Sequence, residues 1–337
     1  MPDGGLMVSV LSASYPRGVT PGARLELTGS RLPVPADGPP RVWVGALEAR
    51  VVAASSWAVS IIVPVECAGG PTPVRVDGVD GDTLVIDVAR VLATDVHHVD
   101  SPVCAPDGTV YATQSGTREN KSETPLFRIA PDGTRVPLTP AISNPTSLAL
   151  GPDDAVYVSS RFESVVYRLN ERGDAERYVS DLGVPTGLAF GRDGALYVGD
   201  RSGSILRVSP GAGREVETFA TLPPSVAAFH LAMGPDDCLY VTVPTLASRD
   251  VVYRISPDRQ VDAWYTGFGR PQGLNFDATG TLFVVDALAG SAGLYRVEIG
   301  ASPPEPELVV AAPQLVGVAS HPDGGLVLAS SDTLWRL

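Results

Sequence analysis

Short hydrophobic runs alternate with polar turns along most of the chain, and the runs recur in a fixed order. A unit begins with an apolar run such as Leu188-Ala189-Phe190, followed by the turn Arg192-Asp193-Gly194 and a second run with tyrosine, Leu196-Tyr197-Val198. A third run ends in an apolar residue followed by arginine, and a fourth run is more polar. This pattern predicts β-strands joined by tight hairpins, because Asp and Gly tolerate the left-handed backbone angles that such turns need.

The third run marks six copies of the unit: Phe127-Arg128, Tyr167-Arg168, Leu206-Arg207, Tyr253-Arg254, Tyr295-Arg296 and Trp335-Arg336. The copies follow one another at intervals of 39 to 47 residues, which is the length of a four-stranded propeller blade. We therefore predict an all-β fold with a six-bladed β-propeller over residues 83–337. The last copy has only three runs before Leu337, so we expect a strand within residues 83–95 to complete it and close the ring.

Residues 1–82 have a different pattern, which predicts a small β-sandwich. The order of its motifs resembles the IPT/TIG immunoglobulin-like family. The motifs are Tyr15-Pro16-Arg17-Gly18-Val19-Thr20-Pro21-Gly22, Leu27-Thr28-Gly29-Ser30, Val42-Trp43-Val44-Gly45 and Ile62-Val63-Pro64. The resemblance implies a domain that acts as a spacer, a packing partner or an interaction module.

The repeats resemble the six-bladed superfamily that includes NHL repeats and the regucalcin–gluconolactonase family, also described as senescence marker protein-like or LRE. The residues that carry the resemblance are Pro185-Thr186-Gly187-Leu188-Ala189-Phe190 with Leu196-Tyr197-Val198, and Pro271-Gln272-Gly273-Leu274 with Phe283-Val284-Val285-Asp286. The resemblance implies a metal-dependent lactone hydrolase, a lyase or a binding platform.

Composition narrows the range of partners. The formal net charge is −13, which argues against binding to nucleic acid or to an anionic membrane surface. No apolar run is long enough to span a membrane, and the N-terminus lacks the pattern of a secretion signal. The three cysteines are far apart and have no metal-binding spacing. We expect a cytoplasmic protein of bacterial type whose partner is a small-molecule ligand or another protein.

The loops between second and third runs vary in length, whereas the turns between first and second runs are nearly alike. Variable loops at one face of a rigid ring are a usual place for a site. Aligning the repeats puts one residue of each at this mouth: Asp100, Thr146, Thr186, Phe229, Gln272 and Val316. We predict that ligand-binding residues come from this set.

The resemblance implies a divalent metal on the axis, bound by oxygen ligands. Asp100-Ser101-Pro102 falls where the family has a Glu-Gly-Pro-type motif, so Asp100 is the candidate metal ligand. The equivalent Asn-Gly and Asp-Gly positions hold Thr186-Gly187 and Gln272-Gly273. Only one of these residues is a carboxylate, so the ligand set for calcium or zinc is incomplete.

His230 stands where most other repeats have Gly or Ser, so its imidazole should project toward the axis. We consider His230 and Asp100 as catalytic candidates, with His230 as a base or a ligand-orienting group. The alternative is that His230 fills space and bonds to a neighbouring blade.

Arg161 and Arg201 occupy matching places after the second runs, beside Ser160 and Asp200. They could hold an anionic ligand, or they could form ion pairs between blades. Asp286 belongs to the same set and could supply a second carboxylate to the mouth. The repeated arginines of the third runs are interpreted as packing between blades.

The motifs of serine hydrolases, zinc proteases and phosphate-binding loops are absent. The sequence favours a small-molecule-binding propeller, with lactonase- or esterase-like hydrolysis as the reaction if it is an enzyme. The alternative function is a non-catalytic interaction protein that uses the propeller face and the N-terminal domain.

Overall fold

The computed structural model describes residues 9–79, 83–116, 122–288 and 290–337. Every regular element in these residues is a β-strand, which confirms the all-β class. The described residues contain no helix with the length and apolar character needed to cross a membrane. The chain divides into two compact units: residues 9–79, 83–91 and 308–313 with Leu337 form the first, and the remaining described residues form the second. The predicted boundary at residue 82 lies outside the described residues.

The first unit holds nine strands: β1 (Val10–Tyr15), β2 (Gly18–Val19), β3 (Arg24–Ser30), β4 (Val42–Val44), β5 (Leu47–Ala54), β6 (Ala58–Ile62), β7 (Gly70–Val76), β8 (Leu84–Val88) and most of β29 (Glu307–Ala311). Alternate residues of β3 and β6, such as Leu25 and Ile61, are fully buried in its core. The period-two pattern of the sequence therefore places the apolar face correctly.

The predicted immunoglobulin-like sandwich of the IPT/TIG type is not supported. The strands of this unit are not divided into two separate sheets, because β5 joins its two halves. Its first residues, Leu47–Ala49, pair with β4, and Arg50–Ala54 pair with β6. A strand of eight residues is long enough to bond to two different neighbours in succession, so the strands form one continuous sheet.

The second unit contains five four-stranded antiparallel sheets, which are the blades of a β-propeller. The first two are β10 (Val103–Cys104), β11 (Val110–Thr113), β12 (Leu126–Ile129) and β13 (Arg135–Leu138), then β14 (Pro145–Leu150), β15 (Val156–Ser160), β16 (Val165–Leu169) and β17 (Ala175–Val179). The third and fourth are β18 (Pro185–Phe190), β19 (Leu196–Asp200), β20 (Ser204–Val208) and β21 (Val216–Thr221), then β22 (His230–Met233), β23 (Leu239–Thr242), β24 (Val252–Ile255) and β25 (Val261–Tyr265). The last blade consists of β30 (Leu315–Ser320), β31 (Leu326–Ser330), β32 (Thr333–Arg336) and β9 (Arg90–Thr94).

The predicted count of six four-stranded blades is wrong, since the described residues form five such separate sheets. The remaining repeat shows three antiparallel strands in the second unit: β26 (Pro271–Phe276), β27 (Leu282–Asp286) and β28 (Gly293–Val297). Its expected outer strand, β29, pairs in parallel with β2 through Val310 and Ala311, and these residues belong to the first unit. The sequence pattern does not reveal this pairing because it involves only two residues of β2.

The strand that completes the last blade lies within the range of residues 83–95 expected for it, toward the end of that range. Residues Leu84–Val88 form β8 and pair with β7 in the first unit. Arg90–Thr94 form β9, the strand next to β32. The blade that contains the C-terminal strands is therefore completed by a segment from near the start of the second unit, which leaves β32 without an open edge.

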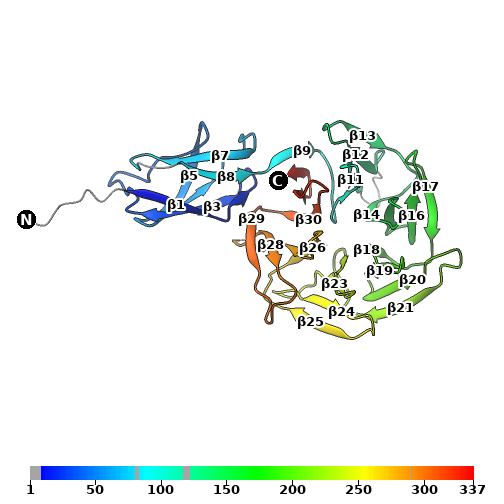
Figure 1. The fold of residues 1–337 in the computed structure, drawn as a ribbon. Coiled ribbons are helices and arrows are strands. Elements are labelled where there is room, and N and C mark those ends of the chain that lie inside the picture. The colour runs from blue at the N-terminus through cyan, green and yellow to red at the C-terminus, as the bar shows by residue number, and fades with distance from the viewer. Residues whose placement is uncertain (1–8, 80–82, 117–121, 289) are drawn as a thin grey trace, which may run out of the picture. The chain divides into compact units, whose positions relative to one another are not determined.

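The first strands of the repeats follow one another around a closed circuit, as Figure 1 shows for the second unit. β14 contacts β18, β18 contacts β22, β22 contacts β26 and β26 contacts β30, while β10 contacts both β14 and β30. The innermost strands of six repeats therefore surround one axis, and β10 lies opposite β22 in this order.

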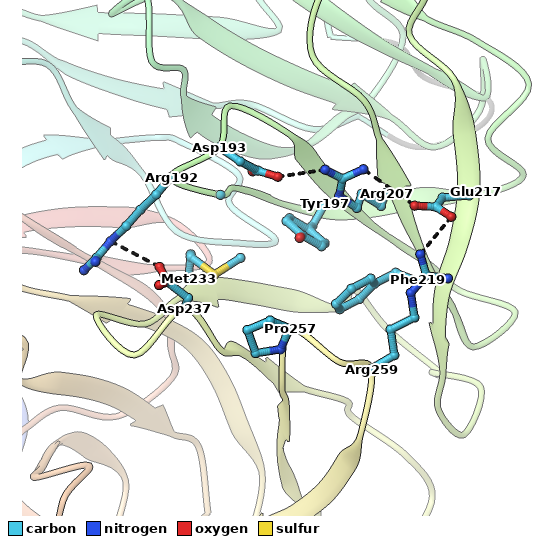
Figure 2. A pocket seen from close by; sticks show the side chains of 11 residues that line it. Arg192, Asp193, Tyr197, Arg207, Glu217, Phe219, Met233, Asp237, Pro257 and Arg259 are labelled. Atoms are coloured by element: carbon cyan, nitrogen blue, oxygen red, sulfur yellow. Dashed lines mark hydrogen bonds and ion pairs between the residues drawn. The ribbon is translucent and has the colours of Figure 1, made fainter.

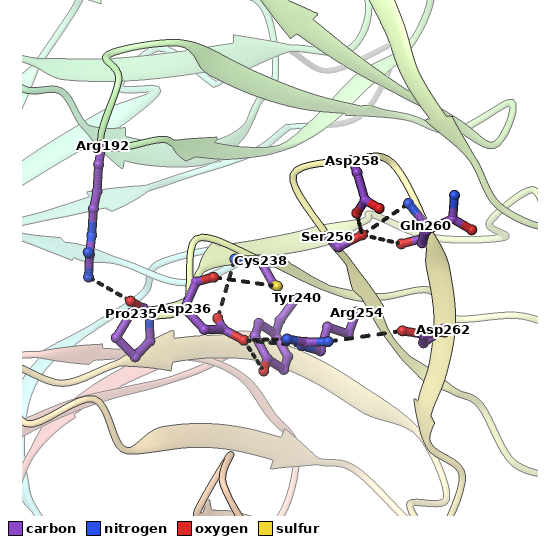
Figure 3. Close-up of polar contacts among 10 residues, drawn as sticks. All are labelled: Arg192, Pro235, Asp236, Cys238, Tyr240, Arg254, Ser256, Asp258, Gln260 and Asp262. Atoms are coloured by element: carbon purple, nitrogen blue, oxygen red, sulfur yellow. Dashed lines mark hydrogen bonds and ion pairs between the residues drawn. The ribbon is translucent and has the colours of Figure 1, made fainter.

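A brace of Asp, Tyr and Arg explains why arginine recurs in the third strands. In the fourth blade, Arg254 donates to the Asp236 carboxylate at 2.9 and 3.1 Å, and the Tyr240 hydroxyl donates to the same carboxylate at 3.2 Å (Figure 3). Burial acts to raise the pKa of Asp236, but the hydrogen bonds from Arg254 and Cys238 and the charge of Arg254 together outweigh it, so the pKa is lowered. Equivalent pairs join Arg168 to Asp153 and Arg207 to Asp193. The expected packing between blades is thus wrong for these residues, because the arginine ties the third strand to the first turn of its own blade.

Candidate functional site

A cavity of about 270 Å³ follows the axis of the ring. It is lined by the segments Asp100–Cys104, Ser147–Leu150, Leu188–Phe190, Leu231–Met233, Leu274–Phe276 and Val318–Ser320. Each segment belongs to the first strand of a repeat or directly precedes it. The cavity is therefore built from all six innermost strands, and a small molecule or a few water molecules would fill it.

The cavity does not lie where the sequence placed the mouth. Its lining reaches the last residues of the first strands, such as Leu150 and Phe190, on the side of the turns between first and second strands. Of the residues predicted at the mouth, only Asp100 lines it. The residues outside the lining are Thr146, Thr186, Phe229, His230, Gln272 and Val316.

Asp100 and His230 meet at the axis. Oδ1 of Asp100 lies 2.6 Å from Nδ1 of His230, and the two side chains are 7% and 1% exposed. Asp100 precedes β10 and His230 opens β22, and these strands belong to opposite repeats in the ring. The pair therefore spans the axis at one end of the cavity.

The carboxylate of Asp100 orients the imidazole. Oδ1 also accepts a hydrogen bond from the backbone N–H of Ser101 at 2.6 Å. The other nitrogen of the imidazole, Nε2 of His230, is buried and has no hydrogen-bond partner among the described residues. A histidine that donates from Nδ1 to a carboxylate keeps a lone pair on Nε2, which is the arrangement of a general base. A buried polar atom without a partner also marks a place where a ligand or water molecule can bind.

His98 lies two residues before Asp100 in the chain and was not predicted as a site residue. Its side chain is buried, and neither ring nitrogen has a hydrogen-bond partner among the described residues. Burial, with a smaller effect of His97, lowers the pKa of His98 to about 3, although the charge of Asp100 opposes the shift. His98 is therefore neutral at ordinary pH. Its separation of two residues from Asp100, which favours a shared side of an extended chain, was the available signal.

Three of the predicted ligand-binding residues form contacts between neighbouring repeats. The hydroxyl of Thr186 donates to the carbonyl of Gly199 at 3.0 Å and accepts from the N–H of Phe229 at 3.0 Å. The carbonyl of Gln272 accepts from the Thr242 hydroxyl at 2.6 Å. These contacts hold neighbouring repeats together, and the Thr186 hydroxyl has little capacity left for a ligand, whereas the contact at Gln272 is made by its backbone carbonyl and not by its side chain. Thr146 is buried, and its hydroxyl faces the carbonyl of Asn144 at 3.5 Å.

The predicted carboxylates at the ends of the second strands bind backbone groups. Asp200 accepts from the N–H of Val184 at 2.8 Å, and Asp286 accepts from the N–H groups of Gly269 and Arg270 at 3.0 and 2.7 Å. Both carboxylates thus hold the segment that leads into the first strand of their own repeat. They are not brought to Asp100.

The residues present at the axis do not fit the divalent metal that the resemblance implies. Among the described ranges, no three His, Cys, Asp or Glu side chains gather as a group that could hold a metal ion. Asp100 already bonds to His230 and Ser101, and the hydroxyl of Thr186 is taken up within the ring. Hard cations need several charged oxygen ligands, so we derive no step through a metal.

A larger groove of about 520 Å³ lies between the third and fourth blades (Figure 2). Its charged side chains neutralise one another. The ion pairs are Arg207–Asp193, Arg207–Glu217, Arg259–Glu217 and Arg192–Asp237. A groove of the same volume, about 520 Å³, recurs at the equivalent place between the first and second blades. These grooves recur because the blades repeat the same strand arrangement. We consider the axis the stronger candidate for a site because Nε2 of His230 has no hydrogen-bond partner among the described residues.

Glycine at position 317 allows the Asp100 segment to approach the last blade. A Cβ atom at Gly317 would lie 2.4 Å from Cα of Ser101. We expect Gly317→Ala to lower the free energy of unfolding by about 1–3 kcal/mol, because the backbone beside Asp100 must move. Chemical denaturation measures the loss, with Gly213→Ala as the control, since nothing lies within 4 Å of a Cβ at Gly213. Equal stability of the two variants would contradict this tight fit.

The comparisons with known proteins agree with this architecture. A family model described as "Strictosidine synthase-like, N-terminal" matches residues 184–208, which contain β18, β19 and β20. No curated protein matches the sequence.

Three solved structures illustrate the likeness in fold. A gluconolactonase from Xanthomonas campestris has 15% identity and a TM-score of 0.59, with 88% of this chain and 96% of that chain covered. An auxiliary nutrient binding protein from Bacteroides ovatus has 12% identity and a TM-score of 0.56, with 98% of each chain covered. The virginiamycin B lyase of Staphylococcus aureus, in a catalytically inactive form with histidine replaced by alanine and with quinupristin, has 16% identity and a TM-score of 0.51, with 88% and 98% covered. At these identities the likeness shows the fold and not the activity.

Proposed function

We propose that this protein binds a small molecule at the axis of its propeller and hydrolyses a lactone or ester bond there, with His230 as the general base. One observation carries the proposal: Nε2 of His230 is buried without a partner in the described structure, while Nδ1 is held by Asp100. Histidine oriented by a carboxylate in this way is a recurrent catalytic arrangement. The likeness in fold to a gluconolactonase supports the class of reaction. The likeness to a lyase that is inactive in a histidine-to-alanine form supports histidine-centred chemistry.

In the proposed reaction, Nε2 accepts a proton from a water molecule whose oxygen adds to the carbonyl carbon of the substrate. The bond between that carbon and the ring or ester oxygen then breaks, and the imidazolium returns the proton to the departing oxygen. Asp100 stabilises the imidazolium while it exists. Because Nε2 has no exposed surface in the described structure, the substrate or water must displace groups that cover it.

We also propose that β26–β28 is a sixth blade of the same ring. It has the sequence features of the other repeats, with a turn at Asp277, an aromatic residue at Phe283 and the pair Tyr295-Arg296. β26 contacts β22 on one side and β30 on the other. A ring of six sectors agrees with Asp100 and His230 meeting across the axis.

Kinetics of the His230→Gln variant test the function. Glutamine can keep a hydrogen bond to Asp100 but cannot act as a base, so we expect kcat to fall about 10²–10⁴-fold on whichever lactone or aryl ester the wild type turns over best. Asp100→Asn should also lower kcat, because an amide no longer stabilises the imidazolium. Arg172→Gln is the matched control, since this exposed side chain lies in the turn after β16 and away from the axis.

Unchanged kcat in His230→Gln would remove His230 from the mechanism. If the folded wild-type protein turned over none of the lactones and aryl esters tested, the proposal of hydrolysis would be wrong. A non-catalytic interaction protein would then be favoured.

A further inference from the structure

We propose that the axial cavity binds a small primary ammonium ion with a short aliphatic chain, and that the Asp100 carboxylate holds its charge. Asp100 lines this cavity, whereas His230 does not. A ligand in the cavity would therefore contact the carboxylate and not the imidazole. The inference goes beyond the proposed hydrolysis, because it concerns binding in the cavity and needs no turnover.

One oxygen of the Asp100 carboxylate is left for a ligand. Oδ1 accepts both hydrogen bonds of the group, from Ser101 and from His230. Oδ2 accepts none from the residues that the structure describes, and it is not fully enclosed. The side chain as a whole is 7% exposed, so this oxygen has little contact with bulk solvent. A carboxylate oxygen with free lone pairs in such a place can accept hydrogen bonds from an N–H donor.

The charge of the cavity lining favours a cation. No Arg, Lys or His is found among the described residues that line it, and Arg161 and Arg201, the candidates for holding an anion, lie outside it. Cys104 belongs to the lining, but burial raises the pKa of its thiol to about 12, so the thiol is neutral. While the imidazole of His230 is neutral, Asp100 keeps its negative charge. An ammonium ion is attracted by this carboxylate, and an anion is repelled by it.

The turns toward which the cavity extends carry the same sign of charge. The six turns between first and second strands hold eight aspartates: Asp107, Asp153, Asp154, Asp193, Asp236, Asp237, Asp277 and Asp323. Five of them pair with arginines. Asp107, Asp154 and Asp277 form no ion pair with any described residue. Negative charges around an opening raise the local concentration of cations, so they would guide a cation toward Asp100.

The rest of the lining indicates a primary amine with a short aliphatic chain. Each first strand is the end strand of its sheet, so the carbonyl groups of its other edge have no partner strand. A primary ammonium has three N–H groups for such carbonyls and for Oδ2, whereas a quaternary ammonium has none. Apolar side chains recur at one place in five of the lining segments and would contact the chain: Leu148, Leu188, Leu231, Leu274 and Val318. The volume of about 270 Å³ limits the ligand to a small molecule.

Calorimetric titration of the full chain with n-butylammonium tests the site, in phosphate buffer with the ionic strength held constant by sodium chloride. We expect saturable binding to the wild type. Butyrate, n-butanol and tetramethylammonium should bind about tenfold more weakly or less, because the first reverses the charge, the second lacks it and the third lacks N–H donors.

Asp100→Asn locates the site, because it keeps the shape of the side chain and removes its charge. It should weaken n-butylammonium binding about tenfold or more. Asp181→Asn is the matched control and should bind as the wild type does. It removes the same charge from an exposed residue between β17 and β18, at the other end of the first strands.

The comparison among the four probes uses the wild type alone, so it tests the proposal even if Asp100→Asn folds poorly. No saturable heat with n-butylammonium, butyrate binding as tightly as n-butylammonium, or unchanged affinity in Asp100→Asn would each overturn the proposal. These results are independent of the hydrolytic function, since a cavity that does not bind n-butylammonium can still belong to a protein whose turnover depends on His230.

Discussion

Replacing His230 by alanine should lower the free energy of unfolding of the second unit by about 3–5 kcal/mol. The variant leaves the Asp100 carboxylate 7% exposed and without its imidazole partner, so a buried charge loses the group that compensates it. It also removes a fully buried ring from the axis. Hydrogen exchange measured over β10 and β22 reports this loss locally, which matters because a chain of two units need not unfold in one step.

The reverse truncation should cost less. Asp100→Ala removes the charge and leaves only the ring nitrogens of His230 without partners, so we expect a loss of about 1–3 kcal/mol. The loss of free energy of unfolding in the double variant should be smaller than the sum of the losses in the two single variants. In the double variant neither a buried carboxylate nor a buried imidazole remains without its partner. Strict additivity would mean that Asp100 and His230 do not interact across the axis, and it would remove the basis of the proposed catalytic pair.

Much of the propeller can be predicted because its repeats are encoded locally. Tyr157, Tyr197 and Tyr240 mark second strands that are buried along their length. The Asp-containing turns before these strands and the arginines after them mark the hairpins of the same blades. Strand spacing and turn chemistry are properties of adjacent residues, so a single sequence reveals them. The aromatic contacts between blades follow from the same pattern, as in Tyr157 against Phe190, with ring centres 4.7 Å apart.

Long-range pairings are not visible in this way. β2 is a strand only because Gly18 and Val19 pair with both β8 and β29, and two residues carry no period. The division of β5 between two partners likewise depends on how the chain bends, and it turns the expected sandwich into one sheet. The alternation of polar and apolar residues in one strand does not determine which strand will pair with it.

For the candidate site, the sequence likewise predicts the position of each residue along its repeat but not the contacts that its side chain makes. Asp100 and His230 could each be placed near the axis by aligning the repeats, but they are 130 residues apart and their contact depends on the closure of the ring. Thr186 was placed equally well, yet its hydroxyl is used between Gly199 and Phe229. A hydroxyl that clasps two strands and one that binds a ligand look alike in a sequence, because only the neighbouring donors and acceptors distinguish them.

Leu196→Ala should lower the free energy of unfolding of the second unit by about 2–5 kcal/mol. Leu196 is fully buried in β19, in a cluster that includes Val166 of the second blade and Val198 and Val208 of the third. Truncation therefore opens a cavity in the layer that joins two blades. The rigid strands around it are held by hydrogen bonds on both sides, which limits how far they can move to fill the space.

Val216→Ala provides the matched control, since Val216 lies in β21 of the same blade but is 42% exposed. Its substitution should change the free energy of unfolding by less than about 0.5 kcal/mol. Denaturation followed by hydrogen exchange in β14–β20 compares the two variants. The loss in Leu196→Ala should spread to the protection of β15 and β16, because the cavity lies between blades and not within one. A loss confined to the third blade would mean that blades are stabilised individually, and the ring would then contribute little to holding Asp100 against His230.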